Sequence, residues 1–262
     1  MKLALPDWRT GRIAETPLIL LALALPLAAV AGSEGVTLAI RLCVLAAVAL
    51  GWIFVFARLR GRPMRADGLV TAALLALLLP AETPFWHLVL GATFGVVLAE
   101  EIFGGRGRGF VHPAVAALAF LAFSFAAPDY RQDPGVPTLA VLPALVLLVL
   151  AGQASWRLLL AAAATFTLVL LAQGGVDPAR LSGSVLLVLL FLGADPVASG
   201  ATQAGRWLHG VLLGLLTALF TQAGPLFGSA LFAVLMASIF APTLDAVVVA
   251  LHMRWREARH VR

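Results

Sequence analysis

The chain has 262 residues, of which 61% are hydrophobic and only 12% are charged, and its mean hydropathy is +1.00. Soluble domains carry about 25% charged residues, so this composition excludes a chain built of soluble domains and indicates a polytopic membrane protein. The single cysteine, Cys43, excludes an internal disulfide and a self-contained iron–sulfur cluster, which requires about four ligands.

Ten apolar segments follow one another along the chain, and each is predicted to be a helix. The expected fold is therefore all-α, with a single integral membrane domain over residues 1–262. A full span needs about 20 residues, so the third and eighth segments are short. Such spans are tolerated where neighbours or water-lined cavities satisfy the open helix ends. The segments lie near 17–32, 37–58, 68–80, 85–103, 113–127, 137–152, 156–173, 182–194, 207–222 and 228–252.

The basic residues predict the orientation of these spans. With ten spans, all but three of the 18 Lys and Arg residues fall on one side, and the exceptions are Arg41, Arg131 and Arg180. Basic residues mark the cytoplasmic side of a membrane protein, so both termini are expected in the cytoplasm. The N-terminus is polar for too long to resemble a cleavable signal peptide, so the first helix is expected to be retained. Topology thus accounts for the net charge of +5, and no nucleic-acid partner is expected.

Two stretches of the chain resemble each other and suggest an internal repeat. Each has a short apolar helix, a break that contains proline and a long helix with glycines, around residues 75–97 and 189–216. Repeats near 17–127 and 137–252 would each hold five helices, so the second would lie inverted relative to the first. Interrupted helices at matching positions of inverted halves point to a site near the membrane midplane. Close packing of small residues is the alternative explanation.

Two blocks of residues resemble the NqrB/RnfD family, the membrane subunits of sodium-pumping NADH:quinone reductase and of the Rnf electron-transport complex. Gly104-Gly-Arg-Gly-Arg-Gly-Phe-Val-His-Pro-Ala114 is similar to the family's GGLGxNxFNPA. Asp195-Pro-Val, Thr202 and Gly205-Arg206 are similar to its TDPVTxxxTxxGR. The resemblance covers roughly residues 65–127 and 180–250. It implies a ten-helix subunit of the bacterial inner membrane that binds flavin, as FMN or riboflavin, and relays electrons, with cation movement coupled to them.

Covalent FMN is the point at which this chain departs from the family. The family carries it on a threonine of a long extracytoplasmic loop after the fifth span, whereas this chain has only a short connection, in which Thr138 is the nearest threonine. Thr202 stands in the letters SGAT, which also occur in the attachment signature. The aspartate of that signature lies six residues earlier, where this chain has Pro196, and the loop is predicted to face the cytoplasm. A non-covalent flavin is therefore expected.

Glycine and charged residues supply the other candidate ligands. Gly104, Gly105 and Gly107 give a loop whose backbone N–H groups could approach a phosphate or a planar ring, or they simply end the fourth helix. His112 occupies the position of a family asparagine, and Pro113 suits the first turn of the fifth helix. The candidate cofactor-binding residues are thus Gly104, Gly105, Gly107, His112, Pro113, Asp195, Pro196, Thr202 and Arg206, with Thr138 as the doubtful covalent site.

Acidic residues within or beside the membrane are costly unless they are paired or functional. Asp195 precedes a proline at the end of a short helix, and Arg206 is expected to be its partner. This pair would either fix the turn or leave Asp195 to bind flavin or pass an ion. Asp245 lies in the last apolar segment without an evident partner and is a second ion-path candidate. Glu100 and Glu101 close the fourth helix and are expected to be solvated.

These observations leave three hypotheses open. The first is a subunit of a multi-subunit oxidoreductase that works with other membrane and redox subunits, with a flavinylated extracytoplasmic domain and with the lipid bilayer. The second is a channel or transporter for a small solute, because paired broken helices also occur in transporters. The third is a scaffold subunit without a cofactor. A visible spectrum of the purified protein separates the first from the others.

Overall fold

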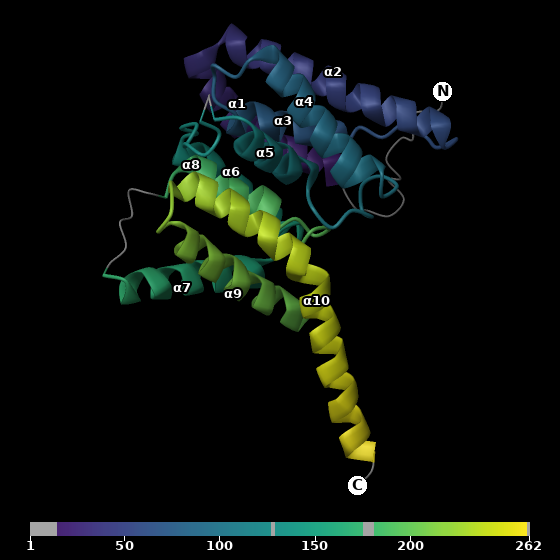
Figure 1. The fold of residues 1–262 in the computed structure, drawn as a ribbon, viewed down its shortest axis with the longest axis vertical. Coiled ribbons are helices and arrows are strands. Elements are labelled where there is room, and N and C mark those ends of the chain that lie inside the picture. Colours follow the sequence, from purple (N-terminus) through teal and green to yellow (C-terminus); the bar gives the residue numbers. More distant parts are fainter. Residues whose placement is uncertain (1–14, 127–128, 175–180, 261–262) are drawn as a thin grey trace.

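A computed structural model describes residues 15–126, 129–174 and 181–260 of the chain. Within these ranges all regular structure is helical (Figure 1). The elements are α1 (Glu15–Glu34), α2 (Val36–Leu59), α3 (Gly68–Leu78), α4 (Phe85–Phe94), η2 (Gly95–Glu101), α5 (Pro113–Ser124), α6 (Thr138–Leu150), α7 (Trp156–Ala172), α8 (Gly183–Leu187), η4 (Val188–Gly193), α9 (Gln203–Phe220) and α10 (Leu226–His260).

Every predicted apolar segment corresponds to a helix, which confirms an all-α polytopic membrane protein. The α1, α2 and α10 helices are long and apolar enough to cross a membrane by length and composition, and shorter apolar helices account for most of the others. The third and eighth segments are short, as predicted: α3 has 11 residues, and α8 with η4 ends at Gly193. The π-helical turns η2 and η4 continue α4 and α8 directly.

Local sequence signals explain where several helices begin. His112 caps α5 by accepting a hydrogen bond from Ala114 N, and Pro113 follows at the first helical position. Ser182 caps α8 and Thr202 caps α9, each with its side-chain oxygen. These residue types satisfy backbone N–H groups that have no partner in the first turn of a helix.

The helices pack in a pattern that is similar in the two halves of the chain. In the first half α4 packs on α2 and α5, and in the second half α9 packs on α7 and α10. The α1 and α6 helices, which begin the two halves, also pack on each other. In Figure 1, α1 to α4 lie on one side of α5, α6 and α8, and α7 with α9 lies on the other. This arrangement is what a two-repeat chain would have, and the repeat limits stay a prediction.

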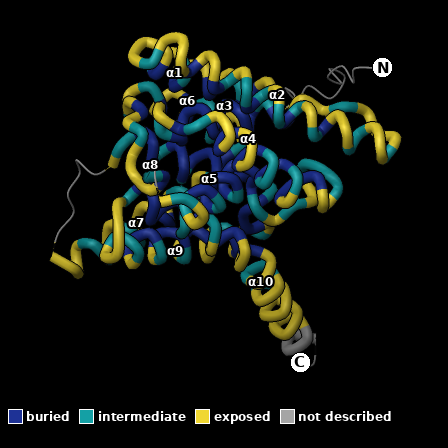
Figure 2. The backbone as a smooth tube through the Cα atoms, turned by 45° about the horizontal axis from the view of Figure 1, so that its top comes forward, coloured by how far each residue is buried: buried dark blue, intermediate teal, exposed yellow. Residues whose placement is uncertain are grey.

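The core is centred on the short helix α3. Ten of its 11 residues are buried, whereas α1, α2 and α10 each expose one side (Figure 2). A helix that is buried on all sides needs no polar face, which explains why GLVTAALLALL has almost no polar residue. The longer helices that surround α3 therefore make the contact with the membrane.

Glycines allow the closest helix contacts. A Cβ on Gly210 or Gly214 of α9 would lie 2.3 Å from a backbone oxygen of α7, on Leu158 or Ala162. A Cβ on Gly95 would lie 2.3 Å from Pro113 O. Small residues let membrane helices approach in this way, and here they hold η2 against the start of α5.

Candidate functional site

The two sequence blocks meet in space. Arg106, in the loop after η2, forms an ion pair with Asp195, in the loop after η4, with 3.4 Å between Nη2 and Oδ1. Both side chains are buried, at 8% and 5% exposure. The prediction that Arg206 pairs with Asp195 is wrong, because Arg206 donates its Nε–H to Gly200 O at 3.2 Å. Arg206 therefore ties down its own loop.

A small cavity of about 20 Å³ lies beside this ion pair. Arg106, His112, Gln153 and Asp195 give it a polar end, and Pro196 with apolar side chains of α1, α3, α6 and η4 lines the rest. A space of about 10–15 Å³ is enough for one water molecule, so the cavity has room for a water but not for a larger group. Three of the predicted ligands, His112, Asp195 and Pro196, thus share one site with elements of both halves of the chain.

His112 is a neutral hydrogen-bonding group in this site. Burial, together with the charge of Arg106, lowers the pKa of His112 to about 3. Its Nδ1 accepts a hydrogen bond from Ala114 N at 3.1 Å, so the proton of the neutral ring belongs on Nε2. His112 therefore presents one N–H donor, on Nε2, and its Nδ1 is already occupied as an acceptor.

Several partners stabilise the charged form of Asp195, which burial alone would disfavour. Burial raises the pKa of Asp195 above its usual range, and the guanidinium of Arg106 and the backbone N–H groups of Val197 and Ala198 oppose that rise. A buried charge is tolerated when it has such partners. Arg106 is thus the main group that stabilises the carboxylate of Asp195 in the folded protein.

The glycine loop between η2 and α5 has the backbone that only glycine adopts easily. Gly104, Gly105 and Gly107 have φ angles of 108°, 95° and 92°. Arg62, from the loop after α2, donates a hydrogen bond to Gly104 O at 2.9 Å and fastens this loop. Gly104 and Gly105 line a second cavity of about 50 Å³, and Arg106 lines both this cavity and the one beside Asp195.

Acidic side chains on that second cavity are buried rather than solvated, so the expectation for Glu100 and Glu101 is wrong. They are 4% and 7% exposed. Glu101 pairs with Arg60 at 3.2 Å, and Asp67 pairs with Arg65 at 2.7 Å. The cause is the loop after α2, which folds back over the end of η2 and supplies the arginines.

Thr202 and Asp245 form a separate cluster. Asp245 of α10 accepts hydrogen bonds from Ala201 N and from both the backbone N–H and the hydroxyl of Thr202, at 2.6, 3.0 and 2.6 Å. The Thr202 oxygen also accepts from Gly205 N at 2.9 Å. Asp245 therefore has the partner that the sequence did not reveal, and it attaches the start of α9 to α10. The predicted roles of Thr202 in cofactor binding and of Asp245 in an ion path stay predictions.

Thr138 lies away from the Asp195 site. It is the first residue of α6, whose last turns supply Leu148 to the cavity beside Asp195. Ten residues of helix separate the two, which corresponds to about 15 Å along the axis. The structure therefore does not bring Thr138 together with the other candidate ligands.

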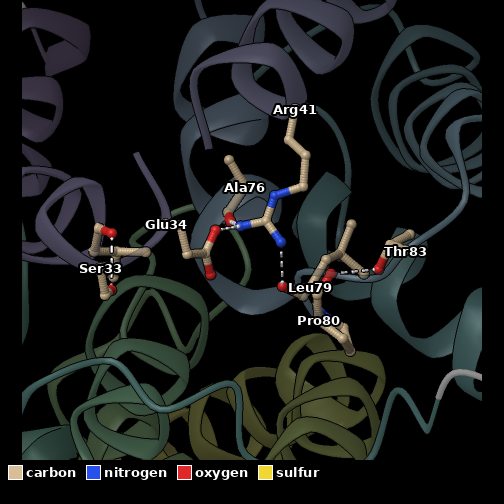
Figure 3. Close-up of polar contacts among 8 residues, drawn as sticks. Ser33, Glu34, Arg41, Ala76, Leu79, Pro80 and Thr83 are labelled. Carbon is tan, nitrogen blue, oxygen red and sulfur yellow. Dashed lines mark hydrogen bonds and ion pairs between the residues drawn. The ribbon is translucent and has the colours of Figure 1, made fainter. Parts of the chain in front are cut away.

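Arg41 is a buried charge whose role the sequence analysis did not assign. Its side chain is 3% exposed and points from α2 to the end of α3 (Figure 3). It donates hydrogen bonds to Ala76 O at 2.7 Å and Leu79 O at 3.1 Å, and it pairs with Glu34 at 2.7 Å. The last carbonyls of a helix lack partners and attract a cation, so Arg41 completes the short helix. An arginine inside an apolar segment was the available signal.

A family model and individual proteins that resemble the chain point to the same family. The model of the NQR2, RnfD, RnfE family matches residues 9–129 and 135–254. Proteins that are similar to the chain occur in several bacteria and are named as a subunit of the Na(+)-translocating NADH-quinone reductase. The protein of Haemophilus influenzae (strain PittEE) is 29% identical, and the match covers 79% of this chain and 66% of that protein.

Two further relatives with the same name are similar to the chain to the same degree. That of Klebsiella pneumoniae (strain 342) is 29% identical, with 79% and 65% of the two chains covered. That of Chromohalobacter salexigens is 30% identical, with 79% and 64% covered. The chain spans just under two thirds of the length of the curated relatives it matches. The two ranges that match the family model meet in the connection between α5 and α6.

Proposed function

The chain belongs to the NQR2, RnfD, RnfE family, and we propose that it is a membrane subunit of an Nqr- or Rnf-like electron-transport complex. Its relatives are named as a subunit of a Na(+)-translocating NADH-quinone reductase. The chain is a polytopic membrane protein with bacterial relatives, which supports a place in the inner membrane. The distribution of basic residues supports both termini in the cytoplasm. Other membrane and redox subunits, and a flavinylated extracytoplasmic domain, are the partners that this function requires.

The observation that carries the proposal is the Arg106–Asp195 pair, which joins both family-like blocks in one buried site. A flavin would supply one-electron and two-electron transfer there. The donor set suits the pyrimidine edge of an isoalloxazine, because Arg106 and the Nε2–H of His112 donate and Asp195 accepts. The space of about 20 Å³ does not take a ring. A bound flavin would therefore need a wider site than the structure shows.

The flavin is proposed to be non-covalent. Thr138 stands at the far end of α6, and the hydroxyl of Thr202 already donates to Asp245 and accepts from Gly205. Neither threonine therefore presents a free oxygen at the Asp195 site. For coupled ion movement, Asp195 is the stronger candidate of the two acids, since the loop before α9 occupies both oxygens of Asp245.

A spectrum of the purified protein tests the proposal. We expect flavin absorption bands, release of the flavin on denaturation and loss of bound flavin in Asp195→Asn and Arg106→Gln. The matched control is Arg157→Gln, which removes a charge that lies over the ring of Trp156 instead. A protein that is folded, assembled with its partner subunits and free of flavin would overturn the redox function and leave the scaffold or channel hypothesis. Fluorescence that remains on the protein after denaturing electrophoresis, and disappears in Thr138→Ala or Thr202→Ala, would overturn non-covalent binding.

A further inference from the structure

Two guanidinium groups converge on the glycine loop. A Cβ placed on Gly104 would lie 3.1 Å from Nη1 of Arg108 and 3.7 Å from Nη1 of Arg62. The two arginines come from different loops, and Arg62 is held there by its bond to Gly104 O. The two guanidinium groups thus approach the same position, and an anion bound between them would offset the repulsion of their charges.

The charges around these two arginines do not supply that anion. Arg60 pairs with Glu101, Arg65 pairs with Asp67, and Arg106 pairs with Asp195. Glu100 is buried on the inner side of the same region and has no ion pair in the described part of the chain. Within residues 15–126, 129–174 and 181–260, Arg62 and Arg108 have no carboxylate partner, and both are exposed. Both side chains therefore reach the surface without an ion pair in this part of the chain, and Arg62 acts on the carboxylate of Glu101 only at longer range.

An apolar groove begins at the same loop. Phe103 and Phe110, which flank the glycines, are exposed and lie edge to face at 5.4 Å. From there a groove of about 470 Å³ runs between η2, α5 and α10. The residues that line it include Phe94, Leu98, Ala116 and Phe120. The groove is thus long, open and apolar, with two cations near one end.

We propose that Arg62 and Arg108 bind the phosphodiester of an anionic phospholipid, such as phosphatidylglycerol, and that one acyl chain lies in the groove between η2, α5 and α10. Arginine binds phosphate oxygens with two parallel N–H donors, and basic pockets between membrane helices on the cytoplasmic side bind acidic headgroups. The predicted orientation places this loop at the cytoplasmic leaflet. A soluble phosphate would satisfy the arginines but would leave the groove without an occupant.

This site is independent of the proposed electron transfer, because neither Arg62 nor Arg108 lines the cavity at Asp195. The test uses native mass spectrometry of the full chain in detergent, titrated with phosphatidylglycerol or phosphatidylcholine. The variant Arg62→Gln/Arg108→Gln should bind phosphatidylglycerol about tenfold more weakly, since it loses two charge-assisted contacts. The matched control Arg157→Gln/Arg254→Gln removes the same charge from the same predicted side and should bind as the unchanged protein does.

The outcomes are distinguishable. Equal loss of affinity in both double variants would show that net charge alone attracts the lipid and would overturn the site. Arg108→Gln serves as a second variant, because the described residues make no hydrogen bond to that guanidinium, so it should fold normally and still weaken binding. The melting temperature of Arg108→Gln in phosphatidylcholine shows whether this variant folds normally.

Two further arms separate a lipid from other phosphates. Phosphatidylglycerol with long acyl chains should bind more tightly than the dihexanoyl form, and Ala116→Leu, which narrows the groove, should reduce that difference. Excess inorganic phosphate should not displace the long-chain lipid. Displacement by phosphate alone, or equal affinity for both chain lengths, would mean that the arginines recognise a free anion, and the lipid site would be rejected.

Discussion

Arg106 and Asp195 stand 89 positions apart in the chain, yet their side chains meet at 3.4 Å in the interior. The pair joins the loop that follows η2 to the loop that follows η4. Both side chains are buried, so the pair links the two halves of the chain in addition to the packing of α1 on α6 and of α5 on α10. Its energetics can be tested with variants that are close in shape.

Replacing Arg106 alone should lower the free energy of unfolding more than replacing both Arg106 and Asp195. In Arg106→Gln the carboxylate of Asp195 is left buried without a cation, and loss of one partner of a buried pair costs about 3 kcal/mol. In Arg106→Gln/Asp195→Asn no charge remains, so much of that stability should return. Thermal melting in detergent at neutral pH measures both. Losses that simply add in the double variant would show that the two side chains are not coupled.

The stability lost in Arg106→Gln should depend on pH. Burial raises the folded-state pKa of Asp195 above the unfolded value of 3.8, and loss of Arg106 removes the main opposing influence. Between the two pKa values the folded state holds more protons than the unfolded state, so stability falls as pH rises through this window. The variant should therefore approach the unchanged protein as pH falls from 7 toward 4. A deficit that grows on acidification contradicts the raised pKa.

Arg41 should be essential for the short helix α3. Arg41→Gln removes the cation that serves Ala76 O, Leu79 O and Glu34, and we expect a loss of about 3 kcal/mol because one partner of a buried pair disappears. Arg131→Gln is the control, since Arg131 is exposed and, among the residues that the structure describes, forms an ion pair with nearby Asp129 alone. Thermal melting compares the two. Equal melting temperatures for the two variants would remove Arg41 from this role.

Thr202 should behave as a helix cap. Thr202→Val removes both hydrogen bonds of the hydroxyl and should cost about 1 kcal/mol, whereas Thr202→Ser keeps the oxygen and should cost little. Gly205→Ala should be worse than Thr202→Val, because its Cβ would lie 2.0 Å from Asp245 Oδ1. Melting temperatures rank the three variants. A flavin that stays bound in Thr202→Val, after correction for stability, would also exclude this residue as the anchor.

Reporter fusions should confirm the orientation of the chain. A reporter after Arg262 is expected to report the cytoplasm, and one inserted after Gln132, between α5 and α6, is expected to report the opposite side. The expectation follows from the distribution of basic residues over ten spans. Two reporters on the same side would remove the ten-span topology, whatever the function of the protein.

The helices could be predicted from sequence because each apolar segment is bounded by charged, glycine or proline residues. The segment near 85–103, for example, ends at Glu101 in the structure, and that near 182–194 ends at Gly193. Length and hydropathy decide such limits locally. The two short helices were also visible, because their apolar runs are too short for a full span.

The partners of the charged residues could not be predicted in the same way. Arg206 is close to Asp195 in sequence, but the start of α9 turns its side chain to Gly200 O, and Arg106 arrives from another loop. Glu100 and Glu101 were expected to be solvated, because nothing in the sequence of residues 60–67 indicates that this loop covers them. Which loops lie together depends on helix packing, which one sequence does not specify.

The π-helical turns have a consequence for any alignment of this chain. In η2 the hydrogen bond of Ile102 N reaches back to Val97 O, and in η4 that of Ala194 N reaches Leu189 O, five residues earlier in each case. Such turns behave as a regular helix with one added residue. A relative that lacks that residue could keep the same loops in the same places, so a single-residue gap at 95–101 or 188–193 signals a conserved geometry rather than a lost function.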